Sequence, residues 1–226
     1  MKALFFSATL RGAEAPVWRR FCVPMDYDFA KLHEVLQILF GYSGREGYEF
    51  VFDTKEGAND LKLRITADVD LYERYRFLKS DEGKHYLADK EKEGYSVDMS
   101  VEVAWAEDLP LDPLALKHRQ FRYIYDFSDD WTYDIELIDV LDDVPPVPAL
   151  REGMGNAPFE ACGGFAGYYE LMDVLTTPDH PDNAAIHAGW TRWATNSMTR
   201  TRSTRRCMRS RKMIAGNARQ WLTSLL

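Results

Sequence analysis

The chain has 226 residues, of which 46% are hydrophobic and 13% aromatic, and its formal net charge is −8. This composition supplies enough apolar side chains for a packed core and excludes a wholly disordered chain. No apolar run approaches the roughly 18 residues that span a bilayer, so we expect no membrane association. The cysteines, Cys22, Cys162 and Cys207, form no paired motif, as is typical of free thiols in the cytoplasm.

The charge is distributed very unevenly along the chain. Residues 190–226 hold nine basic residues and no acidic one, which leaves 19 basic and 36 acidic residues in 1–189, a net charge of −17. A body this acidic repels nucleic-acid phosphates, whereas the basic tail attracts them. We therefore expect the body not to bind nucleic acid.

The first half of the chain alternates between strand and helix signals. An amphipathic helix is expected over 29–40, because Asp28 is a favourable N-cap and Gly41 a favourable end. Charge-rich residues 68–95 are predicted to be helical in part, with an inner stripe of Tyr72, Tyr75 and Leu78. Five further segments have the alternation of strands: 3–10, 16–24, 48–53, 61–66 and 97–105.

Residues 119–140 predict an antiparallel hairpin around which the domain is organised. Aromatic and aliphatic side chains alternate along one face of each strand: Phe121, Tyr123, Tyr125 and Phe127 on the first, and Trp131, Tyr133, Ile135 and Leu137 on the second. The carboxylates of Asp126, Asp129 and Asp130 gather where the chain reverses, beside Trp131.

Loops and short helices flank this hairpin. Residues 108–117, with two prolines, are expected to be a connector before it. A Pro- and Gly-rich loop at 144–167 follows, and loops this long are more often functional than average. Helices are expected at 166–176 and 182–190. The sequence thus predicts one α+β domain over residues 1–190, an antiparallel sheet with helices packed mainly on one face.

Four segments, at 17–24, 32–42, 123–137 and 157–171, have the sequences VWRRFCVP, LHEVLQILFGY, YIYDFSDDWTYDIEL and APFEACGGFAGYYEL. In order and spacing they resemble the Ri-plasmid ORF-three-like proteins. The resemblance implies an α+β fold, occurrence in bacteria, archaea and mobile elements, and no established activity. Some members are labelled resolvase-like, but this chain lacks both a nucleophilic serine flanked by arginines and a basic helix-turn-helix, so we reject that activity.

The chain departs from the family pattern at two histidine positions. Where the family has an HLHxF segment, this chain has EGYEF at 46–50, and Tyr133 replaces the histidine that follows the hairpin tryptophan. Tyrosine donates hydrogen bonds, but its pKa near 10 makes it a poor base at neutral pH. A histidine ligand set or histidine general base is therefore not expected at these positions.

Two function hypotheses follow. The first is a non-enzymatic accessory protein that recognises a protein or a small anionic ligand between the hairpin turn and the glycine-rich loop. The second is a hydrolase or nuclease that uses carboxylate-bound Mg²⁺ or Mn²⁺. The candidate ligand or metal site comprises Asp126, Asp129, Asp130, Trp131, Glu160, Arg19 and Arg20.

Structural alternatives exist for each of these residues. The aspartates suit turn formation, Asp126 is placed to pair with Arg122, and Arg19 is placed to pair with the hairpin acids. A lone histidine such as His33 is typical of a hydrogen-bonded structural residue. These alternatives favour the first hypothesis over catalysis, with no resident cofactor expected.

The basic tail has the composition of a displaced reading frame. Between Met198 and Met213, thirteen of sixteen residues are Met, Thr, Arg or Lys, whose codons share the form ANG. Aspartate and glutamate codons read one base late take this form. We therefore predict a frameshift between about Trp190 and Met198, leaving 191–226 poorly ordered; a nucleic-acid-binding basic arm is the competing interpretation.

Overall fold

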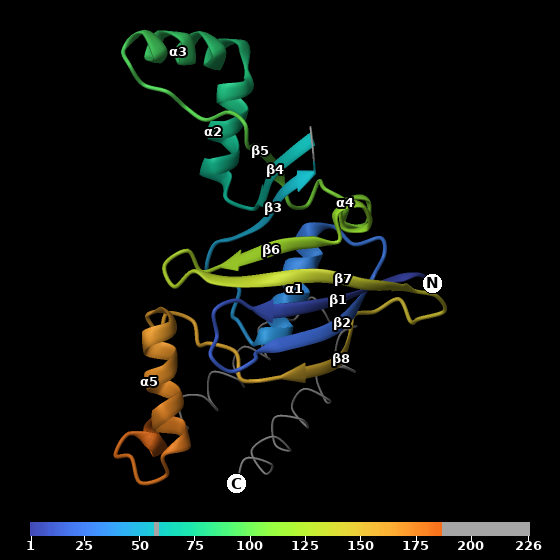
Figure 1. The fold of residues 1–226 in the computed structure, drawn as a ribbon, viewed down its shortest axis with the longest axis vertical. Helices are drawn as coiled ribbons and strands as arrows, with labels where there is room; N and C mark the ends of the chain where they lie inside the picture. The colour runs from blue at the N-terminus through green and yellow to red at the C-terminus, as the bar shows by residue number, and fades with distance from the viewer. Residues whose placement is uncertain (57–58, 187–226) are drawn as a thin grey trace.

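Eight strands form one sheet in the spatial order β5-β4-β3-β6-β7-β1-β2-β8 (Figure 1). The computed structural model describes residues 1–56 and 59–186. Neighbouring strands are antiparallel except β4 and β5, which run parallel. The strands are β1 Ala3–Leu10, β2 Trp18–Pro24, β3 Tyr48–Glu56, β4 Asn59–Thr66, β5 Glu102–Trp105, β6 Gln120–Tyr125, β7 Trp131–Leu141 and β8 Ala149–Met154. The predicted α+β fold is confirmed.

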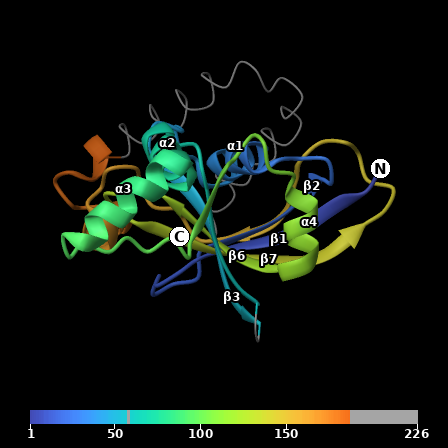
Figure 2. The same ribbon diagram turned by 90° about the horizontal axis from the view of Figure 1, so that it is seen from above.

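The helices lie around this sheet, and α1 covers one of its faces (Figure 2). In Figure 1, α2 and α3 project beyond the β4–β5 end, and α5 lies beside the turn between β6 and β7. The helices are α1 Phe29–Phe40, α2 Val69–Lys79, α3 Asp81–Lys92, α4 Leu111–His118 and α5 Gly164–Thr176. No helix in the described part of the chain is long and apolar enough to cross a membrane.

Helix α1 begins and ends where the sequence predicts. The Asp28 carboxylate accepts a hydrogen bond of 2.7 Å from the Lys31 amide, and Gly41 ends the helix in the left-handed conformation. Between them, the fully buried Phe29 ring contacts the ring of Phe50 edge-on, with centroids 5.1 Å apart. Aromatic contacts of this kind hold α1 on the sheet.

The helical arm formed by α2 and α3 confirms the predicted stripe. Leu78 is buried, Tyr72 packs on Trp105 with ring centroids 5.4 Å apart, and the Tyr75 hydroxyl donates to Glu102. Strand β5 covers only 102–105 of the strand predicted at 97–105.

Two segments predicted to be irregular contain regular structure. Residues 111–118 form α4. Pro113 does not prevent this helix, because it lies in the first turn, where the backbone amides have no partner within the helix. Strand β8 lies inside the predicted loop at 144–167 and pairs with β2 at the edge of the sheet. Its sequence, ALREGM, lacks strand alternation. Residues 183–186 of the helix predicted at 182–190 are helical, and residues 187–190 lie outside the described residues, as do the basic tail and the predicted frameshift.

The predicted inward position of Phe127 is wrong. Phe121, Tyr123 and Tyr125 are buried as predicted, but Phe127 is 49% exposed. Asp126, at a φ of 58°, ends the extended conformation and breaks the alternation before Phe127 is reached. The Phe127 ring instead lies over Gly47, where an added Cβ would be 2.6 Å from the ring.

Gly155 marks a close approach of the chain after β8 to the start of β2. Its φ is 75°, and an added Cβ would lie 2.5 Å from the Pro16 carbonyl oxygen. We expect Gly155→Ala to lower the free energy of unfolding by roughly 2–4 kcal/mol, from backbone strain and overlap together. Gly94, with a φ of 87° and open space around it, is the control, and Gly94→Ala should cost about 1 kcal/mol. Equal losses in urea denaturation would contradict the close approach.

Candidate functional site

The hairpin turn (residues 126–130) meets the glycine loop (residues 155–163) at one end of the sheet. The Asp126 carbonyl accepts hydrogen bonds from the amides of Asp129, at 3.1 Å, and Asp130, at 2.7 Å. Asp126 and Asp130 both have positive φ, a conformation that aspartate tolerates better than most residues. The aspartates thus suit the backbone of this turn.

The Asp126 side chain joins the turn to the glycine loop. It is 2% exposed. Its Oδ1 accepts from the amides of Ser128 at 3.1 Å and Asp129 at 3.4 Å, and its Oδ2 accepts from the Ala161 amide at 3.4 Å. A buried carboxylate needs such donors to offset its lost hydration. The predicted alternative, a pair with Arg122, does not describe it: Arg122 lies 4.0 Å from Asp53.

Asp129 and Asp130 differ in what they contact. The Asp129 Oδ2 accepts from the Gly163 amide at 3.2 Å, directly before α5 begins. A carboxylate here satisfies a free amide and complements the helix dipole. Asp130 is exposed and accepts only a long bond, 3.4 Å, from the Thr132 hydroxyl.

Glu160 connects the glycine loop to the residues that follow α1. Its Oε1 accepts hydrogen bonds from the Tyr125 hydroxyl and, at 2.7 Å, from the Ser43 amide. Burial, followed by the bond to Glu160, raises the pKa of Tyr125 above its ordinary value. Tyr125 therefore acts as a neutral hydrogen-bond donor.

Trp131 packs behind this junction and is fully buried. Its ring contacts Phe165 edge-on at 5.2 Å and Tyr168 at 6.3 Å between centroids. Its indole Nε1 has no hydrogen-bond partner within the described residues. Trp131 thus holds α5 against the hairpin and does not point outward as a ligand-binding side chain.

Arg19 and Arg20 do not form one cationic edge. The Arg19 guanidinium donates to the carbonyls of Leu39 at 3.1 Å and Met154 at 2.8 Å, among others, and burial lowers its pKa. Arg20 lies over Trp18 and pairs with Glu152 at 3.3 Å, on exposed side chains. Arg19 therefore links the end of α1 to the residues that follow β8. Among the described residues it donates to main-chain carbonyls, and the predicted pairing of Arg19 with the hairpin acids is not found.

A layer of hydroxyl-bearing rings beneath α1 was not predicted as part of the site. His33 Nδ1 lies 2.8 Å from the Tyr123 hydroxyl, which also receives the Gln37 Nε2 donor at 2.7 Å. Because Gln37 donates to this hydroxyl, the Tyr123 proton is free to bind His33 Nδ1 in the tautomer that carries its proton on Nε2. Burial lowers the pKa of His33 to about 3. The structural role predicted for His33 agrees with this bond.

Cys162 in the glycine loop lacks the environment of a nucleophile. Its thiol donates to the Gly164 carbonyl at 3.6 Å, and burial together with nearby Asp129 raises its pKa to about 11. Reactive cysteines have lowered pKa values. The sequence could not reveal that Asp129 faces this thiol, because the two are joined only through the fold.

The described residues contain no group of three or more His, Cys, Asp or Glu side chains arranged to hold a metal ion. Asp126, Asp129 and Glu160 instead accept hydrogen bonds from main-chain amides and Tyr125, and Asp130 accepts one from the Thr132 hydroxyl. The structure brings together Asp126, Asp129, Glu160 and Trp131. Arg19, on β2, instead binds the carbonyl of Leu39 at the end of α1, and Arg20 and Asp130 have partners of their own.

Comparison with known proteins finds a family, a relative in sequence and a relative in fold. The family model for plasmid pRiA4b ORF-3-like proteins matches residues 2–201. An uncharacterized protein, y4hQ of Sinorhizobium fredii, is 28% identical over 186 residues, 78% of this chain and 74% of its own. The crystal structure of a protein of unknown function, MM3350 from Methanosarcina mazei, is similar in fold, with a TM-score of 0.59 and 21% identity over 82% of this chain and 87% of the other.

The buried Asp126 carboxylate generates a stability prediction. Asp126→Asn replaces a charged acceptor by a neutral amide and should lower the free energy of unfolding by about 2–3 kcal/mol. Asp130→Asn, at an exposed position of similar φ, should change it by less than about 0.5 kcal/mol. Urea denaturation measures both, and equal effects would show that Asp126 only shapes the turn.

His33 generates a pH prediction. Its folded-state pKa is lowered from 6.5 to about 3, so the unfolded state binds protons more readily between these values. The stability from neutral His33 is fully present above about pH 6.5 and falls as the pH drops towards 3, by up to about 1.4 kcal/mol per pH unit. His33→Asn should remove this part of the slope. Urea denaturation from pH 7 to 4 measures it, and parallel curves for both proteins would contradict the assignment.

Proposed function

This chain belongs to the plasmid pRiA4b ORF-3-like protein family, and we propose that it is a non-catalytic accessory protein that binds a partner protein. The proposed contact is the hairpin-tip surface, formed by Phe127, Ser128, Asp129 and Asp130. The observation that carries the proposal is an exposed aromatic ring on a firmly held turn in acidic surroundings.

The turn is fixed on both sides of Phe127. Asp126 and Asp129 bind amides of the glycine loop, as described above, and the Phe127 ring lies over Gly47. An exposed aromatic side chain on a held turn loses little conformational freedom on binding. Aromatic anchors of this kind contribute much of the affinity of protein interfaces.

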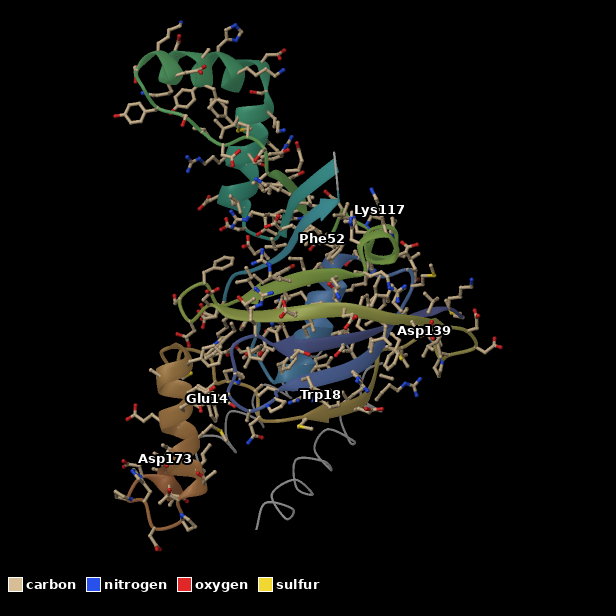
Figure 3. All side chains as sticks on the ribbon, viewed as in Figure 1. Glu14, Trp18, Phe52, Lys117, Asp139 and Asp173 are labelled. Atoms are coloured by element: carbon tan, nitrogen blue, oxygen red, sulfur yellow. The ribbon has the colours of Figure 1, made fainter. Side chains whose placement is uncertain are left out.

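The charges indicate the chemistry of the partner. Residues 126–134 contain four aspartates and no Lys or Arg, and residues 152–186 contain six acidic residues and no Lys or Arg. Two of these acids are paired, Asp134 with Arg11 at 2.8 Å and Glu152 with Arg20 at 3.3 Å, and the others leave the surface acidic. In Figure 3, Asp173 lies on α5 and Glu14 lies beside this helix. An anionic ligand is repelled by this surface, so of the two ligand classes expected from the sequence, a protein with a basic and apolar segment is favoured.

The carboxylates support binding over catalysis. A metal-dependent hydrolase needs open carboxylate oxygens on one centre. Here Asp126, Asp129 and Glu160 accept hydrogen bonds that hold the hairpin turn to its neighbours.

A photo-crosslinking experiment tests this proposal. The full chain with Phe127→p-benzoylphenylalanine, expressed in its native host, should form a discrete adduct whose crosslinked peptide is rich in Lys and Arg. The yield of the adduct should fall several-fold when a lysate is irradiated at 0.5 M NaCl, because salt screens the attraction between surface charges. It should also fall with the added substitution Asp130→Asn, which removes one of those charges.

The matched control is Tyr95→p-benzoylphenylalanine, at a ring that is 66% exposed and follows the end of α3. Adducts of the same identity from both positions, or an acidic crosslinked peptide from position 127, would overturn the proposal. Absence of any adduct from position 127 would overturn it as well.

A further inference from the structure

An unpaired acceptor lies in the hydroxyl-rich layer beneath α1. Gln37 is 7% exposed, and its side-chain oxygen Oε1 has no hydrogen-bond partner within the described residues. Its Nε2 donates to the Tyr123 hydroxyl, and this bond orients the amide. A buried carbonyl without a hydrogen-bond donor costs free energy. Because nearly all buried polar atoms in proteins are hydrogen-bonded, a bound molecule with a donor group is expected at this oxygen.

Two stacked pairs of aromatic rings lie in the same layer as this acceptor, which Tyr123 joins to His33. His33 and Tyr48 stack with centroids 3.6 Å apart, and Tyr42 and Tyr125 stack at 4.5 Å. The His33 and Tyr125 centroids, one from each pair, are 6.2 Å apart. Faces of aromatic rings attract cations within about 6 Å.

A short loop, residues 43–47, covers the acceptor. An added Cβ at Gly44 would lie 3.8 Å from Gln37 Oε1, so Gly44 is the nearest part of this cover. Its φ of 73° favours glycine. The Ser43 amide binds Glu160, whose carboxylate adds a negative charge at the edge of the layer.

We propose that Gln37 Oε1 and the rings around it form a binding site for the primary ammonium group of a small organic amine. The ammonium donates to Oε1, its charge faces the rings of His33 and Tyr125, and Glu160 balances the charge. His33 does not oppose this ligand, because its imidazole is neutral at physiological pH. The proposed protein contact adjoins this site, because the Phe127 ring lies over Gly47 at the end of the same loop.

Two other side chains carry buried polar atoms without partners among the described residues. Trp131 Nε1 is a donor, and it cannot bind an ammonium. His118 lies beside Phe52, with ring centroids 5.8 Å apart, and has no comparable set of rings and carboxylate. Gln37 alone combines an acceptor with a cation-binding environment.

The test is a titration of the full-length protein with methylammonium chloride at constant ionic strength, followed by amide and ring NMR signals. We expect saturable shifts at Ser43, Gly44 and Glu46 with a Kd on the order of 10 mM, which is what two non-hydrogen atoms permit. Nuclear Overhauser effects should join the ligand methyl group to the rings of His33 and Tyr125. Sodium acetate should produce no such shifts.

The matched variant is Gln37→Met, which keeps the length of the side chain and removes the acceptor. It should weaken methylammonium at least tenfold. Equal binding by the variant would overturn the proposal, as would binding of acetate. Absence of saturable shifts in the native protein would also overturn it and would leave an ordered water as the partner of Gln37 Oε1. If the variant does not fold, the nuclear Overhauser effects in the native protein decide between these outcomes.

Discussion

A buried carboxylate, that of Asp126, fixes the end of the molecule where its motifs meet. It accepts amides from its own turn and from Ala161, 35 residues further along the chain. Removing a charge from water is costly unless donors replace the lost hydration. The turn and the glycine loop must therefore stay together for this carboxylate to remain buried, and the positions of Glu160, Trp131 and α5 follow from that constraint.

The layer beneath α1 depends on the same junction. Glu160 reaches the Tyr125 hydroxyl and the loop after α1 because the glycine loop is held in place. Further along the layer, the hydroxyls of Tyr42 and Tyr133 share a hydrogen bond of 2.5 Å. A core with this many polar groups specifies its partners closely, since each misplaced hydroxyl would lose its bond. This part of the core thus combines packing with the polar groups of the proposed amine site.

The sequence predicted the elements whose signals are local. The α1 boundaries depend on Asp28 and Gly41, and the hairpin on strict alternation, so both were found. Helix α4 was missed because two prolines suggested a connector, and β8 because an edge strand needs no alternation. Of the candidate site residues, the structure brings Asp126, Asp129 and Glu160 together at the glycine loop. Their amide partners, and the burial of His33 and Gln37, arise from tertiary packing that no spacing in the chain encodes.

Native-state hydrogen exchange of the Ala161 and Gly163 amides tests the central claim most directly. If the Asp126 and Asp129 carboxylates hold the glycine loop to the hairpin, these two amides should exchange only through the opening that also exposes the Tyr133 amide in β7, with similar protection. Exchange of Ala161 and Gly163 at the rate of an open loop, while Tyr133 stays protected, would contradict the account.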